Sequence, residues 1–250
     1  LLIVTLGTNG AVVILDDGGV CIDIKAASPS TRTVLRYYNP DDDSLQGVGD
    51  WTVEQVQAWA ARCLKMITGR TSDVQVRDSD WIINHNEACP NDPDQSDPAH
   101  PGHDWHEYHS GRKPYPKGWA AMARAWIELL HQTEAENANR RAAGRPIIRL
   151  AIGALAQGTP EWEELLAMDS TGLFEVMEQF GCIWGVHEGT FTDQDVDYGF
   201  GDNPTPGAGQ MPNAPVTPNA GNACMRVMYL YVNILRPKVI FLPFFTGEFY

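Results

Sequence analysis

Residues 80–90, DWIINHNEACP, combine a short apolar run with a polar end that contains Glu87. A second stretch, residues 238–250, reads KVIFLPFFTGEFY and has the same design, with Glu248 after its apolar run. Each run has the length of a fully buried strand, and each carboxylate comes where that strand would end. Because the carboxyl ends of parallel strands meet at one edge of a sheet, we expect Glu87 and Glu248 to lie close together.

A pair of carboxyl groups at one sheet edge indicates a particular chemistry. Hydrolysis of a glycosidic bond requires one carboxyl group to protonate the leaving oxygen and a second to attack the sugar or to activate water. The net charge of −14 argues against nucleic acid or an anionic membrane as the partner. A neutral carbohydrate substrate is compatible with this charge, and the chemistry requires no cofactor.

Short apolar runs alternate with amphipathic helices along the whole chain, which is typical of strand–helix units around a parallel sheet. The clearest helix begins after Thr52, which can form a capping box with Gln55, and it ends at Gly69. Strands are predicted at residues 11–15, 33–37, 81–84, 147–155, 182–186 and 239–245. Further helices are predicted at residues 19–27, 119–130, 160–163, 173–180 and 227–234.

Six strand–helix steps predict an α/β fold of the TIM type, a (β/α)₈ barrel. A closed barrel has eight strands, so we expect an incomplete barrel in which strands one and eight are missing or partial. Residues 1–250 would form this single domain, and residues 90–117 and 199–221 would be long loops on the side of the active site. The chain is expected to begin and end inside a domain, which leaves its compartment and oligomeric state open.

The two glutamate segments resemble clan A glycoside hydrolases, which are (β/α)₈ enzymes with an acid/base glutamate on strand four and a nucleophilic glutamate on strand seven. Asn86 and Glu87 are similar to the Asn-Glu-Pro end of strand four, with two residues inserted before the proline. Residues 245–249, FTGEF, are similar to the Thr-Glu-Phe-Gly end of strand seven, with an extra glycine before Glu248. His187 is similar to the histidine that the family places on strand six.

The resemblance implies a retaining glycoside hydrolase that acts on an oligo- or polysaccharide. Glu87 would be the acid/base, with its pKa raised by the neighbouring charge of Glu248, and Glu248 would be the nucleophile. Asn86 would hydrogen-bond the 2-hydroxyl group of the sugar, and His187 would orient the nucleophile or bind sugar. The family often has an aromatic residue two positions after this histidine, where this chain has Gly189.

Three further residues are candidates for substrate binding. Arg36, near the end of the strand at residues 33–37, could keep the nucleophile ionised by charge pairing. An arginine at such a position more often serves packing or lies on the surface. Trp105 and Tyr108 belong to the long loop at residues 90–117, where their rings could stack on sugar faces.

A histidine cluster leaves a second function open. His100, His103, His106 and His109 lie in PAHPGHDWHEYH, and imidazoles at this density can bind zinc. Their spacing of three does not match the helical HExxH motif, and the proline-rich flanks predict a loop. The alternatives are therefore a metal-dependent hydrolase that uses this cluster, and a non-catalytic carbohydrate-binding or truncated barrel.

The cysteine pattern predicts buried thiols rather than a disulfide framework. The chain has an odd number of widely spaced cysteines, and several of them fall inside apolar patterns. They are Cys21, Cys63, Cys89, Cys182 and Cys224. No uninterrupted apolar stretch is long enough to cross a membrane as a helix.

Overall fold

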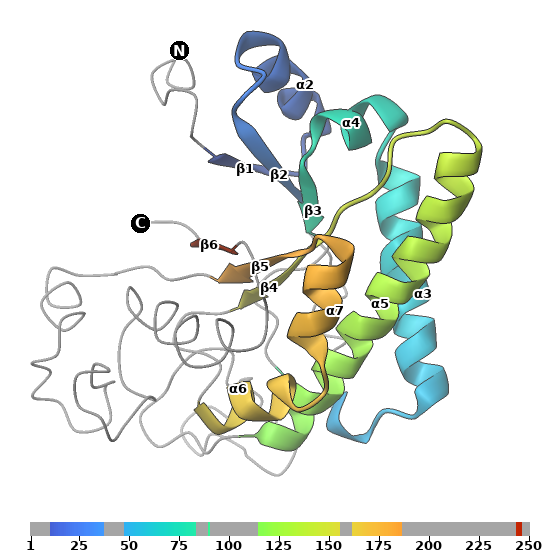
Figure 1. Ribbon diagram of the computed structural model, residues 1–250, viewed down its shortest axis with the longest axis vertical. Helices are drawn as coiled ribbons and strands as arrows, with labels where there is room; N and C mark the ends of the chain where they lie inside the picture. The colour runs from blue at the N-terminus through green and yellow to red at the C-terminus, as the bar shows by residue number, and fades with distance from the viewer. Residues whose placement is uncertain are drawn as a thin grey trace, which may run out of the picture.

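The computed structural model describes residues 11–37, 48–83, 90, 115–155, 162–186 and 244–246 (Figure 1). In this part of the chain, helices contain far more residues than strands do. The elements follow in the order β1 (Ala11–Leu15), α2 (Gly18–Ala27), β2 (Arg32–Arg36), η2 (Val48–Asp50), α3 (Val53–Arg70), α4 (Asp73–Asp78), β3 (Trp81–Ile83), α5 (Pro116–Ala142), β4 (Ala151–Leu155), α6 (Trp162–Asp169), α7 (Leu173–Phe180), β5 (Ile183–Val186) and β6 (Phe244–Thr246).

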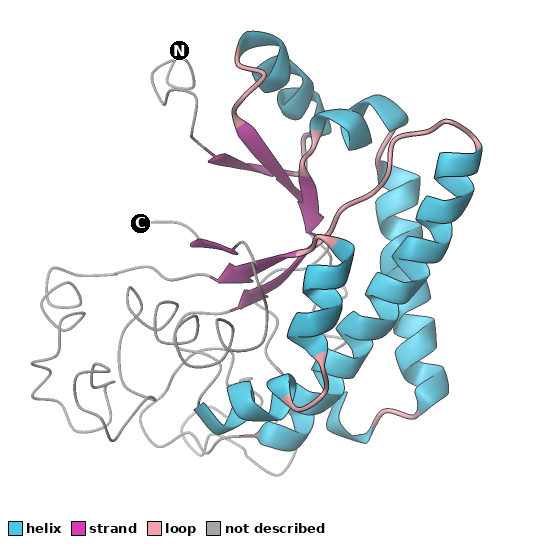
Figure 2. Ribbon diagram, in the orientation of Figure 1, coloured by secondary structure: helices cyan, strands magenta, loops and turns pink. Residues whose placement is uncertain are grey.

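The described strands form two three-stranded parallel sheets, β1-β2-β3 and β4-β5-β6, each in chain order. In the first sheet, Leu35 pairs with Ile14 and Ile82. An isolated parallel bridge between Ile82 and Leu150 connects the two sheets. Figure 2 shows the long helices on one side of the strands. The arrangement is therefore a helical layer that covers one face of two small, linked sheets.

The expected TIM-type (β/α)₈ barrel is wrong. The described strands lie in two separate small sheets that meet at a single bridge, and they do not close on themselves. Closure of a barrel depends on strand tilt and on the stagger of strands far apart in the sequence. Hydrophobic periodicity reports only which short segments are strands and helices, so it cannot reveal whether a sheet closes.

Several local predictions are confirmed. Thr52 caps α3: the backbone N–H of Gln55 donates to the Thr52 hydroxyl, and the Thr52 N–H donates to the Gln55 side chain at 2.8 Å. Gly181 ends α7 in the left-handed conformation, with a φ of 64°. The strand predicted at residues 147–155 is shorter in the structure, where β4 begins only at Ala151. The short helix α4 was not predicted from the sequence.

The two faces of the sheets carry two different apolar clusters. On the helical face, Trp184 is fully buried, with its ring centroid 5.8 Å from that of Trp126 and 5.4 Å from that of Phe174. We call the opposite face the inner face. There a smaller cluster joins strands of both sheets, and its members are Val34, Ile83, Ala151 and Ile183, with Val13 and Trp81 packed against them. The sheets are therefore buried on both faces, as parallel sheets normally are.

The described cysteines agree with the prediction of buried thiols. Cys21, Cys63 and Cys182 are free and buried. Burial raises the pKa of the Cys21 thiol, and it raises that of Cys182 further, because burial disfavours the charged thiolate. Cys89 and Cys224 lie outside the described residues. In the described ranges, no helix combines the length and the apolar character that a bilayer crossing requires.

Asp80 connects the amino-terminal ends of β2 and β3. Its carboxylate accepts hydrogen bonds from Lys25 Nζ at 2.6 Å, Arg32 at 2.8 Å and the backbone N–H of Thr33 at 2.9 Å. Burial raises the pKa of this carboxyl group, but hydrogen bonds from Lys25, the Thr33 backbone and Arg32 outweigh burial and hold the pKa below its usual value. The ionised carboxylate therefore stabilises the fold.

Replacement of Asp80 by asparagine is expected to lower the free energy of unfolding at pH 7 by about 2 to 4 kcal/mol. A carboxyl group with a lowered pKa in the folded state stabilises above its unfolded pKa of about 3.9 and loses this contribution as pH falls through the folded value. Urea unfolding should therefore show a smaller difference in unfolding free energy between Asp80→Asn and the unmodified protein at pH 3 than at pH 7. Asp23→Asn, at an exposed position of α2, is the control. An equal difference in unfolding free energy at both pH values would contradict a stabilising role of the ionised Asp80 carboxylate.

Candidate functional site

The carboxyl ends of the strands form the edge at which the sequence predicts a site. Leu15, Arg36 and Ile83 lie in register at the end of the first sheet, and Val186 pairs with Thr246 at the end of the second. All strand pairs are parallel, and the bridge that joins the sheets is parallel too. The six strands therefore point the same way, and segments that follow them leave from equivalent ends.

Most residues that the sequence predicts for this site lie outside the described residues. Glu87 follows β3 in the sequence, and Glu248 follows β6. The other predicted residues outside the described part are Asn86, Trp105, Tyr108, His187 and the histidine cluster from His100 to His109. The predicted loop at residues 199–221 also lies outside it, and α5 already begins at Pro116, within the predicted loop at residues 90–117.

Arg36 is the predicted site residue that the structure describes. It is the last residue of β2 and is half-buried. Side chains alternate between the two faces of a strand, and Val34 belongs to the inner cluster. Arg36 therefore lies on the inner face, at the carboxyl edge of the sheet. Its backbone carbonyl accepts a hydrogen bond of 2.9 Å from the N–H of Asp16, which joins the ends of β1 and β2.

A polar network that sequence reasoning missed borders this edge. Arg70, at the end of α3, donates to the Asp16 carboxylate at 2.9 Å and lies over the ring of Tyr37, 4.4 Å from its centroid. The Tyr37 hydroxyl is 2.9 Å from that of Thr71. Burial raises the pKa of Tyr37, because the phenolate would be desolvated. The network therefore attaches the end of α3 to the ends of β1 and β2.

Asp16 adopts an uncommon backbone conformation in this network. Its φ of 56° is in the left-handed region, where aspartate is found more often than most other residues. Directly after a strand, this conformation turns the chain toward Asp17, whose carboxylate accepts from the N–H of Gly19 and caps α2. The sequence shows two acidic residues after a strand, but nothing local connects Asp16 with Arg70. The described part of the site is therefore a hydrogen-bonded border with one arginine on the inner face.

The described residues also bear on metal binding. They contain no group of three or more histidine, cysteine, aspartate or glutamate side chains that could hold a metal ion. The histidine cluster on which the metal alternative rests lies outside them, so that alternative stays a prediction.

Comparison with known proteins adds no family to this description. No protein-family model matches the chain, and neither a curated protein nor a solved structure is similar to it. The residues of this chain and the arrangement of its strands are therefore the basis for its function.

Proposed function

We propose that the chain is a glycoside hydrolase that cleaves an oligo- or polysaccharide with retention of configuration, with Glu87 as acid/base and Glu248 as nucleophile. One observation carries the proposal: β3 and β6, the strands that precede the two glutamates in the sequence, belong to one parallel series of strands. Parallel strands deliver the residues that follow them to the same edge. The shared direction of β3 and β6 therefore supports a site in which two carboxyl groups lie close together, as glycoside hydrolysis requires.

The reaction then proceeds in two displacements. The Glu248 carboxylate attacks the anomeric carbon, the bond to the leaving oxygen breaks, and Glu87 gives that oxygen its proton. Glu87, now ionised, removes a proton from water, which attacks the anomeric carbon and releases Glu248. Each glutamate returns to its starting charge, so the cycle needs no external proton donor and no cofactor.

Arg36 supplies further support. The nucleophile must stay ionised next to a second carboxyl group, and a nearby cation favours that state. Arg36 lies on the inner face at the carboxyl end of β2, and Asp16 N–H anchors its carbonyl. In the proposal, Arg36 pairs with the Glu248 carboxylate and keeps it ionised. Asn86 binds the sugar 2-hydroxyl group.

The direct test is a search for the covalent intermediate. The protein is incubated with a panel of activated 2-deoxy-2-fluoro glycosides of different sugars, whose glycosyl intermediates hydrolyse slowly, and is then digested and analysed by mass spectrometry. We expect one fluorosugar on the peptide that contains Glu248, and no adduct in Glu248→Gln. A glycosyl adduct on another residue, or activity that disappears with a metal chelator, would contradict the proposal.

A further inference from the structure

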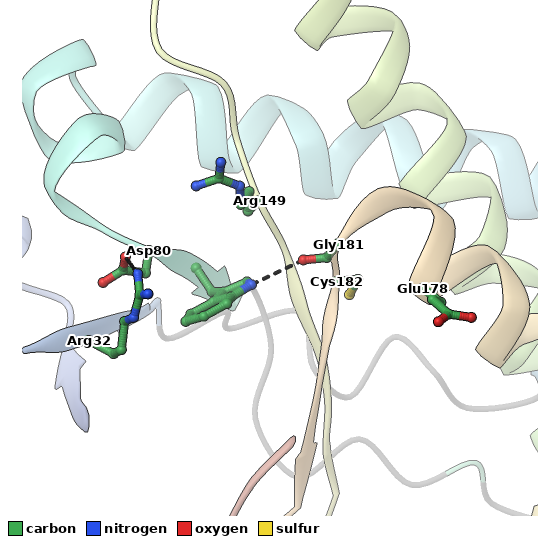
Figure 3. Close-up of a pocket in the computed structure, with 7 residues that line it drawn as sticks. Arg32, Asp80, Arg149, Glu178, Gly181 and Cys182 are labelled. Carbon is green, nitrogen blue, oxygen red and sulfur yellow. Dashed lines mark hydrogen bonds and ion pairs between the residues drawn. The ribbon is translucent and has the colours of Figure 1, made fainter. Parts of the chain in front are cut away.

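A second site lies at the opposite edge of the sheets, where the strands begin. There the structure has a pocket of about 570 Å³ (Figure 3). It is lined by Arg32, Asp80, Trp81, Arg149, Glu178, Gly181 and Cys182. Arg32 and Trp81 are the first residues of β2 and β3, and Cys182 directly precedes β5. The pocket is therefore formed by the amino-terminal ends of strands from both sheets.

The alternation of side chains assigns this pocket to the inner face. Each of four lining residues comes two positions before a member of the inner cluster in the sequence. These residues are Arg32, Trp81, Arg149 and Gly181, which precede Val34, Ile83, Ala151 and Ile183. Residues two apart on a strand share a face. The pocket therefore borders a closed apolar cluster, which shields one of its sides from water.

The aromatic wall of the pocket is held in place. The indole N–H of Trp81 donates a hydrogen bond of 3.2 Å to the carbonyl oxygen of Gly181, marked in Figure 3 by the dashed line that ends at Gly181. This bond spans from β3 to the segment before β5. Trp81 is half-buried and packs against the inner cluster, so part of its ring remains exposed to the pocket. A flat apolar group could stack there at little entropic cost.

The charges around this wall favour a single negative charge on the ligand. The negative charge of the Asp80 carboxylate is already compensated, since it forms ion pairs with both Lys25 and Arg32. Arg149 is exposed, and none of the ion pairs found between described residues includes it. Figure 3 shows Glu178 pointing away from Arg32 and Arg149. Among the lining residues Arg32 and Arg149 balance Asp80 and Glu178, and Lys25, which does not line the pocket but binds Asp80, adds one further positive charge.

We propose that this pocket binds a small aromatic carboxylate. The carboxylate pairs with the guanidinium fork of Arg149, whose parallel N–H groups match its two oxygens, and with the donors of Arg32 that Asp80 leaves unused. The aromatic ring stacks on Trp81, next to the inner cluster. Neither of the proposed catalytic glutamates lines this pocket, so its occupancy does not depend on glycoside hydrolysis.

Calorimetric titration with 2-naphthoate tests the proposal, with 2-naphthol and cyclohexanecarboxylate as probes that lack the charge or the aromatic ring. The unmodified protein should bind 2-naphthoate saturably with a Kd of about 1 mM or lower, and both other probes more weakly. Arg149→Gln should weaken binding of 2-naphthoate about tenfold or more, because it removes the charge-assisted pair. Arg124→Gln, at an exposed arginine on α5, should bind like the unmodified protein.

Two further variants separate the proposal from its alternatives. Trp81→Leu should remove the preference for 2-naphthoate over cyclohexanecarboxylate, and thermal unfolding of each variant establishes that it is folded. Glu248→Gln should bind 2-naphthoate normally, since Glu248 does not line the pocket. Absence of saturable binding to the unmodified protein, or equal affinity of the Arg149→Gln and Arg124→Gln variants, would overturn the proposal whatever the outcome of the glycosidase experiments.

Discussion

Replacing Glu248 by alanine is expected to abolish turnover of every glycoside substrate, with a loss in kcat of at least about 10⁴-fold. The physical reason is that no other group could form the covalent intermediate, and water alone attacks the anomeric carbon slowly. The measurement is hydrolysis of a panel of aryl glycosides by the purified variant and by the unmodified protein. Glu188→Ala, which changes a glutamate near the predicted strand-six histidine, should retain most activity and is the matched control.

Glu87→Ala should behave differently. Its activity should fall strongly on natural substrates but much less on aryl glycosides with good leaving groups, which depart without a proton from the enzyme. Added azide should restore turnover by attacking the glycosyl intermediate and should give a glycosyl azide of retained configuration. Equal losses on activated and natural substrates, together with no effect of azide, would exclude Glu87 as the acid/base. Normal activity of Glu248→Ala would refute the whole glycosidase proposal.

Gly153→Ala is expected to lower the free energy of unfolding by about 3 kcal/mol or more. Gly153 has a φ of 97°, which side chains rarely adopt, and a Cβ there would collide with the carbonyl oxygen of Gly185 on β5. This close approach occurs where the pairing of β4 with β5 shifts register between Ile152 and Leu155. A methyl group would therefore force the two strands apart at the carboxyl edge.

A matched variant separates the collision from backbone strain. Gly172 has a similarly positive φ of 79°, but a Cβ there meets nothing within 4 Å. Gly172→Ala should therefore lower the free energy of unfolding only by the strain of the left-handed conformation, about 1 to 2 kcal/mol. Urea unfolding of both variants, with the unmodified protein as reference, measures the two free energies. If Gly153→Ala cost no more than Gly172→Ala, the close packing of β4 against β5 would not contribute to stability.

Local sequence patterns predicted the described helices and strands well where the determining interactions are short in range. The capping box at Thr52 and Gln55 and the left-handed end of α7 at Gly181 are examples. Both depend on hydrogen bonds or dihedral angles within a few residues, which neighbouring side chains specify directly. The predicted barrel was wrong, because closure depends on pairings between segments that no local pattern encodes.

The candidate site divides in the same way. A strand-end glutamate can be recognised in the sequence, since an apolar run and the polar residues after it are contiguous. The border of Asp16, Tyr37 and Arg70 could not be recognised, because Arg70 reaches Asp16 across 54 positions in the sequence. The amino-terminal pocket was missed for the same reason, as its arginines begin or precede strands of different sheets.

The sequence alone was enough to predict that helices alternate with buried parallel strands, that the described cysteines are buried thiols, and which two glutamates follow strands. Long-range packing was needed to establish that the strands form two linked sheets, that Arg36 and Arg149 lie on the inner face, and that Gly153 must lack a side chain. The first group depends on interactions between neighbours in the chain. The second depends on contacts between distant segments, which exist only once the sheets have packed against α3, α5 and α7.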